Sequence, residues 1–391
     1  MMNHMLIKKI ICIAPLSLCI NTSYAEDFKR FSVSAGWIHV MPQGSANPIN
    51  INTPVRDGKA HRVGLISTKA FLESIDPNAM TTIDPASLEL IPDQKPENIR
   101  ELRRKDFTPL AGVEGATSVA KGFGIVDSDV NGNVLPTSSG YATTSGFENW
   151  TEKGTGLEVK KFNTLGLMFN YYLNPNVSLQ FIAGLPPKVD VQGKGQVYAH
   201  MSGTGLTNHP NKSVRDFLGK IPLKQDIPIT NLGNKPVVST VRAWTPAVEV
   251  QYQFGKPGVD KFRPYIGAGI MYAYFNQVKL NSETRSDLIA AGHMVQNILD
   301  GEAGAALDRK KSSVTPQVRV KAKDDFAPIV TLGFTYDVNE NWFGIASVSY
   351  AKLSNRVNID VTDGKGTKLI RSTTKVDIDP LVTYLGFGYR F

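Results

Sequence analysis

Residues 381–391 alternate strictly between two kinds of side chain, and this alternation constrains the fold more than any other feature of the sequence. One set of positions is apolar or aromatic apart from a single threonine: Leu381, Thr383, Leu385, Phe387, Tyr389 and Phe391. The other set becomes small or polar: Val382, Tyr384, Gly386, Gly388 and Arg390. Because successive side chains of a strand point to opposite faces, the pattern predicts a β-strand between two different environments. Its apolar face belongs either in lipid, in a membrane barrel, or under a second sheet, in a soluble β-sandwich.

Seven earlier segments alternate in the same way, although the first does so weakly. The predicted strands are 31–40, 164–173, 177–185, 244–254, 264–275, 329–338, 342–361 and 368–391. The second, fourth and sixth links between them are short, the first, third and fifth are long, and the seventh is a tight turn at 363–366 between two very long strands. Short turns on one side and long loops on the other are typical of outer-membrane barrels. A β-sandwich gives no reason for this asymmetry.

We therefore predict an all-β fold, an eight-stranded antiparallel up-and-down transmembrane β-barrel with long extracellular loops containing short helices. The even strand number predicts that both termini lie in the periplasm. The barrel would occupy residues 26–391, with large extracellular insertions at about 43–156, 188–238 and 276–325. Helices are predicted near 96–106 and 286–299.

The N-terminal 25 residues have the features of a secretory signal peptide that is cleaved. Lys8 and Lys9 precede an apolar run at 10–20, which is too short to span a bilayer, and small residues flank Tyr24 before Glu26. An uncleaved anchor is the alternative. Both cysteines, Cys12 and Cys19, lie in this segment, so the mature fold would use no disulfide. The prediction places the protein in the outer membrane of a Gram-negative bacterium.

The charge balance favours anionic partners. The chain carries a net charge of +8, and removing the segment with its two lysines lowers this to +6. A basic surface suits the phosphates of outer-membrane lipid and lipopolysaccharide, whereas export argues against nucleic acid as a partner. The run Arg100, Arg103, Arg104 and Lys105 could meet such phosphates, although a solvated helix face is the favoured interpretation.

Several segments resemble the outer membrane protein W (OmpW) family of eight-stranded barrels. The most specific is the Phe-Arg-Pro-Tyr-x-Gly-x-Gly run at 262–269, and the others are 163–172, 183–186 and the stretch from Asp379-Pro380 to Gly388-Tyr-Arg-Phe391. The resemblance implies a narrow barrel that passes small hydrophobic molecules and opens sideways toward the bilayer. It also implies that Tyr389 and Phe391 form the signal recognised by the barrel-assembly machinery.

The resemblance and the strand parity nominate a channel lining. Ile182 is apolar on the otherwise polar inward face of its strand, and it matches a pocket position of the family. Met168, Met271 and Phe275 share inward parity. Ser349 stands where the family carries a tryptophan, which implies a wider or more polar pocket. Filling of the barrel core is the alternative role for these residues.

Three prolines nominate a lateral gate. Pro186 and Pro187 follow the strand 177–185, and Pro246 lies on the strand that would neighbour it. Proline lacks the N–H group that a ladder needs, and a closed barrel has no edge at which to place it. The prolines therefore predict a break in the wall, unless the strand has already left the membrane and entered a loop.

Other chemistry is sparse in the sequence. Residues 127–133 begin with the spacing of a calcium loop, but position twelve is Ser138 where a glutamate is needed, so an Asx-turn is favoured. The histidines after residue 25 show no metal spacing, and no metal, cofactor or catalytic set is predicted. A hydrolase or acyltransferase would need a Ser/His/Asp set at one rim, which no spacing nominates.

The function predicted from these features is an outer-membrane channel for passive uptake of small hydrophobic molecules, with lateral exit near Pro186. The alternative is a structural or adhesive barrel whose large first loop binds a surface or host partner. Deletion of residues 45–150 is expected to separate the two, because a channel would retain transport and an adhesin would lose binding.

Overall fold

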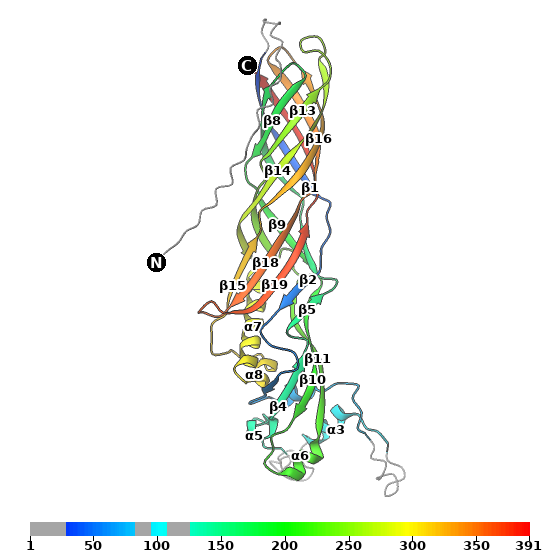
Figure 1. The fold of residues 1–391 in the computed structure, drawn as a ribbon, viewed down its shortest axis with the longest axis vertical. Coiled ribbons are helices and arrows are strands. Elements are labelled where there is room, and N and C mark those ends of the chain that lie inside the picture. Colours follow the sequence, from blue (N-terminus) through cyan, green and yellow to red (C-terminus); the bar gives the residue numbers. More distant parts are fainter. Residues whose placement is uncertain (1–28, 83–94, 108–125) are drawn as a thin grey trace.

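The computed structural model describes residues 29–82, 95–107 and 126–391, so the predicted signal peptide lies outside the described residues. The molecule is elongated, with a barrel at one end and a long extension at the other (Figure 1). We call the barrel end that carries Phe391 the short-turn end. The extension is the part of the chain beyond the opposite end of the barrel. The figures draw the extension at the bottom, and we use 'above' and 'upper' for the direction from the barrel toward the extension.

Within the described residues, eight antiparallel strands close into a barrel, which confirms the predicted fold class. In order around the ring they are β1 (Phe31–Pro42), β7 (Phe162–Tyr172), β8 (Val177–Gly184), β13 (Ala247–Gln253), β14 (Phe262–Leu280), β16 (Asp325–Asp337), β17 (Trp342–Ala351) and β20 (Pro380–Arg390). Pairing of β20 with β1 closes the ring, so the barrel has no free edge. Closure satisfies the backbone groups internally, as a lipid environment requires.

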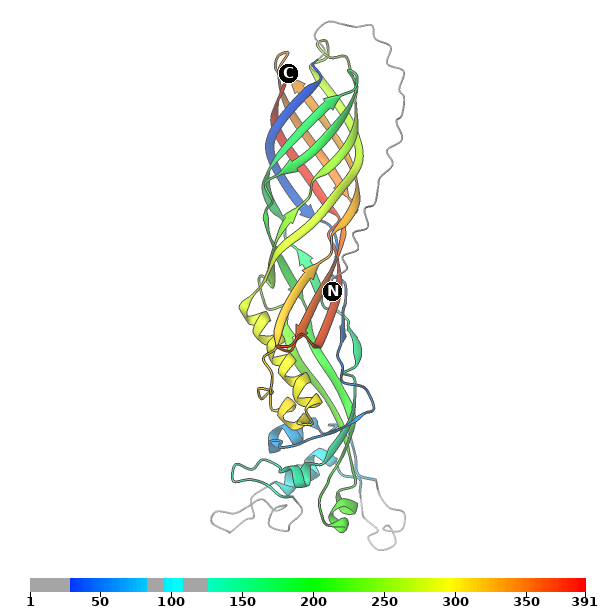
Figure 2. The same cartoon turned by 60° about the vertical axis from the view of Figure 1, so that its left-hand side comes forward.

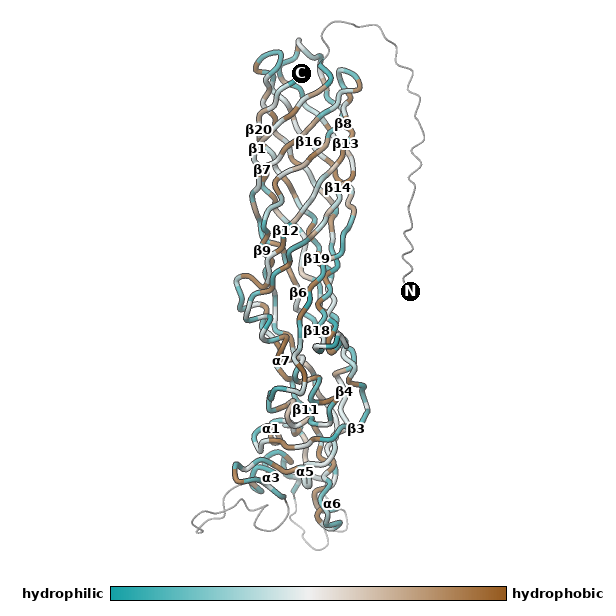
Figure 3. Tube along the Cα trace, turned by 90° about the vertical axis from the view of Figure 1, so that its left-hand side faces the viewer, coloured by the Kyte–Doolittle hydropathy of each residue, from teal (hydrophilic) through white to brown (hydrophobic). Residues whose placement is uncertain are grey.

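Side chains of the barrel strands alternate between the lumen and the outer surface. On β13 the residues Ala247, Glu249, Gln251 and Gln253 are buried, and the residues between them are exposed and apolar. The outer surface also carries Trp37, Leu165, Ile266, Leu332 and Phe387. Figure 3 shows apolar residues recurring along the barrel strands. The outer surface is therefore suited to lipid, while the lumen combines polar side chains with an apolar cluster that includes Met168 and Ile345.

The lumen is filled near the short-turn end. Arg390 donates to Asp337 over 2.7 Å and lies 4.3 Å from the centre of the Phe343 ring. A Cβ atom at Gly388 would lie 2.2 Å from that ring, so only glycine leaves room for it. Arg263 closes the same end through a 2.7 Å hydrogen bond to the carbonyl of Pro175. An eight-stranded barrel has just enough interior for such side chains, which act here as a plug.

The three long links form the extension, and β-sheets make up much of it. One sheet has the order β11 (Lys220–Asn231), β10 (Gln196–Leu206), β4 (Tyr141–Ser145), β3 (Ala60–Arg62). A second has the order β15 (Gln317–Ala322), β18 (Ser354–Thr362), β19 (Lys368–Asp377), β2 (Ile49–Asn52), β5 (Asn149–Glu152). The barrel wall itself continues upward through β12 (Ser239–Trp244), β9 (Lys188–Lys194) and β6 (Gly156–Val159). The stretch 188–238, predicted only as a loop insertion, contains three of these strands, β9, β10 and β11.

The two longest predicted strands are each divided at the upper rim of the barrel. Residues 342–361 form β17 and β18, with a break at Lys352 and Leu353, and residues 368–390 form β19 and β20. At the second break Asp379 has a φ of 40°, and its N–H, like that of Ile378, donates to the carbonyl of Leu353. Pro380 pairs with Pro42 at this level. Residues without an N–H group cannot continue a ladder, so the sheet leaves the barrel here.

The helices drawn in yellow in Figure 2 lie along one side of the extension, and the others lie toward its far end. The predicted helices near 286–299 and 96–106 are confirmed as α7 (Ser282–Leu299) and α3 (Ile99–Asp106). Asparagine side chains cap both N-termini: Asn281 accepts from the N–H of Glu283 and Asn98 from that of Glu101. Shorter helices are α1 (Thr68–Ser74), α5 (Pro136–Ser139), α6 (Lys212–Leu218) and α8 (Ala303–Leu307).

Candidate functional site

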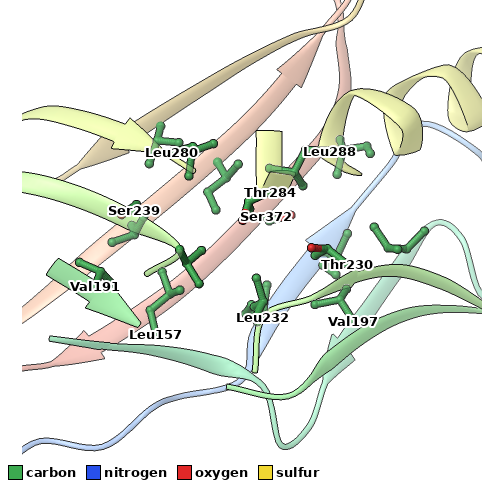
Figure 4. A pocket seen from close by; sticks show the side chains of 18 of the residues that line it. Leu157, Val191, Val197, Thr230, Leu232, Ser239, Leu280, Thr284, Leu288 and Ser372 are labelled. Atoms are coloured by element: carbon green, nitrogen blue, oxygen red, sulfur yellow. The ribbon is translucent and has the colours of Figure 1, made fainter. Parts of the chain in front are cut away.

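The extension encloses an apolar cavity of about 120 Å³, which we call the inner cavity. Its walls come from the strands above the barrel, from the second sheet and from the buried face of α7, which contributes Leu288, Ala291, Met294 and Val295. Figure 4 shows lining side chains such as Val191, Leu232 and Leu280 directed into one space. The few polar members are Thr53, Thr230, Ser239, Thr284, Asn355 and Ser372. Such a cavity accepts hydrophobic matter and excludes ions.

A second cavity of about 90 Å³, the outer cavity, lies farther from the barrel. Its walls come from the sheet that contains β3 and β4, and from α1, α3 and α8. Phe147 and Met294 line both cavities, so these two side chains separate the spaces. We call the two cavities together the apolar passage.

An ion pair between a buried lysine and a half-buried aspartate fastens α7 to the wall of the inner cavity. Lys235 is 6% exposed, and its Nζ lies 2.7 Å from Asp287 on α7 and 3.1 Å from Thr230. Thr230 Oγ1 also donates to Asp287 over 2.7 Å. Because each buried polar group has a partner here, the charges are accommodated beside an apolar space.

The predicted lining residues lie at and below the lower end of the passage. Phe275 lines the inner cavity. Met271 belongs to the same hydrophobic core, and Ile182 packs both against that core and against the cluster inside the barrel that contains Met168. Ile182 and Met271 are both paired with Ala247, so they lie at one level of the wall. Their role as a channel lining stays a prediction.

A polar layer lies deeper in the lumen. Thr331 donates to Glu249 over 2.8 Å and shares a 2.7 Å hydrogen bond with Ser349. Gln251 donates to Gln180 over 2.7 Å. These side chains are buried, and Glu249 and Gln180 are fully so. Ser349 therefore belongs to a hydrogen-bonded network beneath the passage and does not line either cavity.

The hydrogen-bond ladder that joins β8 to β13, and β9 to β12, is interrupted where the prolines lie. The register stops at Ile182 opposite Ala247 and resumes at Lys188 opposite Arg242. In between, the N–H of Ala243 donates to the carbonyl of Pro187 over 3.1 Å. Pro186 and Pro246 also flank the interruption, and none of these prolines has an N–H group to offer. The opposite side of β12–β13 stays paired with β14.

The predicted assembly residues lie at the short-turn end. Tyr389 packs edge-on against Trp342 with ring centres 5.0 Å apart, and Phe391 stacks on Phe31 at 5.9 Å. Asn341 donates to the hydroxyl of Tyr389 over 3.1 Å. The packing places both aromatic residues on the outer surface, and their role in assembly stays a prediction.

The basic residues of α3 are engaged within the protein. Arg103 is buried and pairs with Asp106 at 2.8 Å. Arg104 pairs with Glu101 and Lys105 with Glu97, while Arg100 donates to backbone carbonyls at 73 and 75. The solvated face suggested for this helix therefore does not extend to Arg103.

Residues 127–133 form an Asx-turn. Asp129 accepts hydrogen bonds from the N–H groups of Asn131 and Asn133. Ser138 accepts one from the N–H of Asp127. The acidic spacing in this stretch thus stabilises a turn.

Many residues of the passage escaped the sequence analysis. The inner cavity includes Val191, Val197 and Ala199, the outer cavity includes Met201, and Val189 belongs to the same hydrophobic core. These residues alternate with period two, which was the available signal. Charged residues on the other face of the strands obscured it, and so did Gly193, Gly203 and Gly205, which occupy positions of the inward face without an apolar side chain.

No helix in the described part of the chain is long and apolar enough to cross a membrane.

Comparison with known proteins identifies the family. The OmpW family model matches residues 130–307 and 302–391. The chain is similar to outer membrane protein W of Vibrio cholerae, at 24% identity over 235 residues, covering 60% of this chain and 76% of that protein. It is 22% identical to outer membrane protein W of Escherichia coli K12 over 236 residues, with the same coverage.

Solved structures of outer-membrane proteins are also similar to the chain. OprG from Pseudomonas aeruginosa aligns with a TM-score of 0.45 and 15% identity, covering 93% of this chain and 96% of that chain. Outer membrane protein W of Escherichia coli aligns with a TM-score of 0.30 and 20% identity, covering 61% and 85%. Since the family model matches the chain from residue 130 to its last strand, the chain belongs to the OmpW family of outer-membrane β-barrel proteins.

Proposed function

We propose that the protein is a channel, and not an enzyme, through which small hydrophobic molecules diffuse passively across the outer membrane. The apolar passage above a plugged lumen is the observation that carries this proposal. Buried hydrogen-bonded residues, including Glu249, Thr331 and Gln180, fill the barrel below the passage. Moving an apolar molecule through that layer would disrupt its hydrogen bonds, so a straight route is disfavoured.

A sideways route supplies the exit. A molecule in the inner cavity reaches Phe275, then the level of Met271 and Ile182, and next to Ile182 the ladder to β13 ends. Beyond this point a molecule would leave between Pro186 and Pro246 for the bilayer. In this proposal the extension faces the outside of the cell, and the short-turn end with both termini faces the periplasm.

The passage can be tested by filling it. Ala291 lies on the buried face of α7 and lines the inner cavity, whereas its neighbour Ala290 is exposed. We expect Ala291→Phe to reduce uptake of a radiolabelled linear alkane by outer-membrane vesicles to the rate of vesicles without the protein. Ala290→Phe should leave uptake unchanged. Equal uptake by both variants, with the barrel folded as judged by its heat-dependent gel mobility, would contradict the proposal.

The exit can be tested by restoring ladder donors. We expect the triple variant Pro186→Val/Pro187→Val/Pro246→Val to extend the pairing between β8 and β13 and to slow hydrocarbon uptake in the same vesicles. Pro257→Val, in an exposed turn at the short-turn end, is the matched control. Unchanged uptake in the triple variant would exclude an exit at this place. The passage itself would still be supported if Ala291→Phe blocks uptake.

Deletion of the first loop can no longer distinguish an adhesive barrel from a channel. Residues 43–156 supply Ile49, Ile51, Phe147 and Trp150 to the inner cavity, and β2 pairs with β19. Deleting 45–150 would therefore remove walls of the passage, so retained transport is no longer expected of a channel. Single substitutions such as Ala291→Phe discriminate the two functions better.

We propose two partners besides the solutes. The exposed face of β15, β18 and β19 carries Arg319, Lys321, Arg356, Arg371 and Lys375 above the barrel rim, where lipopolysaccharide phosphates would lie. Tyr389 and Phe391 would be contacted by the barrel-assembly machinery.

A further inference from the structure

The outer cavity contains two polar side chains from neighbouring strands. His61 of β3 pairs with Ala142 of β4, and Thr144 lies two residues beyond Ala142 on the same face. All three residues line the cavity. The two polar side chains are thus adjacent on one wall of an otherwise mainly apolar space.

Each of the two side chains buries a polar atom that has no hydrogen-bond partner. His61 and Thr144 are each 7% exposed. Among the residues that the structure describes, His61 Nε2 and Thr144 Oγ1 have no partner. Leaving such a group unsatisfied costs about 1–3 kcal/mol, so two on one wall need an explanation.

The remaining polar groups of the cavity are satisfied. Arg103 and Asp106 neutralise each other at 2.8 Å. Ser74 and Ser139 donate to the carbonyls of Phe71 and Gly64. Among the described lining residues the cavity therefore offers no free charge, and the unmet hydrogen-bonding capacity is concentrated at His61 and Thr144.

Burial at this position favours the neutral form of His61. It lowers the pKa of His61 below its ordinary value, the charge of Lys59 lowers it further, and a backbone hydrogen bond with Ile298 acts in the opposite direction. In a neutral imidazole one ring nitrogen donates and the other accepts, and Nε2 is the ring atom that is buried without a partner.

We propose that the outer cavity is a binding site for a small, uncharged, mainly apolar molecule with one hydroxyl group, and specifically for a short aliphatic alcohol. The hydroxyl donates to His61 Nε2 and accepts from Thr144 Oγ1, and the hydrocarbon chain extends toward Phe147 and Met294. The inference rests on the proposed function, because it makes this cavity the first part of the apolar passage that an incoming molecule enters.

The size of the space supports a slender ligand. The cavity of about 90 Å³ is smaller than the roughly 150 Å³ that an engineered cavity provides for benzene. The inner cavity of about 120 Å³ begins behind Phe147 and Met294. A linear chain is narrower than a ring and can pass between two side chains, which favours an aliphatic ligand.

The test compares 1-pentanol with hexane, which have the same number of non-hydrogen atoms. Full-length protein in lipid nanodiscs, labelled with ¹⁵N-histidine, is titrated with each compound. We expect 1-pentanol to shift the Nε2 resonance of His61 and hexane to leave it in place. Thr144→Val should weaken 1-pentanol binding about fivefold, the effect of one hydrogen bond of ~1 kcal/mol. Thr143→Val, the same change on the opposite face of β4, should have no effect.

The outcomes separate this inference from the proposed function. If 1-pentanol binds equally to Thr144→Val and to the unmodified protein, or binds without moving the His61 resonance, the inference is wrong. Hydrocarbon uptake that Ala291→Phe still blocks would then leave the channel standing. If Ala291→Phe and Ala290→Phe take up hydrocarbon equally, the proposed function fails, whatever the alcohol does.

Discussion

At the scale of single residues, the same inward parity supports two different roles. Ile182 and Ser349 both face the lumen, yet Ile182 borders the hydrophobic core above and Ser349 joins the hydrogen-bonded layer with Thr331. Height along the barrel axis separates them, because the upper lumen meets an apolar extension and the lower lumen is closed by polar side chains. A residue's face therefore follows from the alternation, whereas its role depends on which neighbours share its level.

His200 joins two sheets of the extension and makes their contact depend on pH. Its imidazole lies 2.7 Å from Asp226 on β11 and 3.1 Å from Glu152 on β5. The hydrogen bond to Asp226 raises the pKa of His200, burial opposes this, and the charge of Glu152 adds to the rise. Because folding raises the pKa of His200, the stability that protonated His200 contributes is fully present below its unfolded pKa. That stability is lost as the pH rises through the folded pKa.

We expect backbone amides around Glu152 and Asp226 to be better protected from hydrogen exchange at pH 5.5 than at pH 8.5, after correction for intrinsic rates. Because the ion pairs of His200 are exposed, the difference in stability between the two pH values should be about 1 kcal/mol or less, which is up to roughly fivefold in protection. His200→Gln should remove the pH dependence, and His39→Gln on β1 should keep it. Protection that rises with pH in the unmodified protein would contradict the assignment.

At the scale of elements, the sheet β15–β18–β19 has two unlike faces. Val318, Val361 and Ile370 are buried toward the core. The exposed face places Arg319 opposite Asp360 and Arg356 opposite Lys375. Asp360 is bound by Arg371 at 3.0 Å and Asp377 by Lys375 at 2.7 Å, so the cations Arg319, Lys321 and Arg356 are in excess over the acids of this face. Such a face beside a barrel rim suits lipid phosphates.

We expect Arg356→Glu/Lys375→Glu to reduce the lipopolysaccharide that copurifies with the protein, because the double change reverses charge at adjacent positions of this face. Lys365→Glu, in the exposed turn between β18 and β19, is the control with the same change of charge per site. Native mass spectrometry counts the bound molecules. Equal lipopolysaccharide content in all three proteins would exclude the face as a binding surface.

At the scale of the whole molecule, the three long links act together as one structure. The first link pairs with the last hairpin through β2 and β19, and with the second link through β4 and β10. The third link adds α7, whose Asp287 is held by Lys235 of the second. The apolar passage lies among them, so no single link contains it.

Local sequence patterns are sufficient to predict the barrel. Period-two alternation and alternating link lengths are local signals, and closure of eight such strands follows from the need to pair every edge in lipid. The prolines at 186, 187 and 246 also act locally, since a missing N–H interrupts a ladder wherever it stands.

The position of the apolar passage depends on tertiary contacts that the sequence patterns do not reveal. Val191, Phe147 and Met294 come from different links, and nothing in their own stretches indicates that they meet. The same holds for His61 and Thr144, whose burial and missing partners arise from contacts across more than eighty positions of the chain. Long-range packing buries such residues together, and alternation within one strand carries no information about what covers its face.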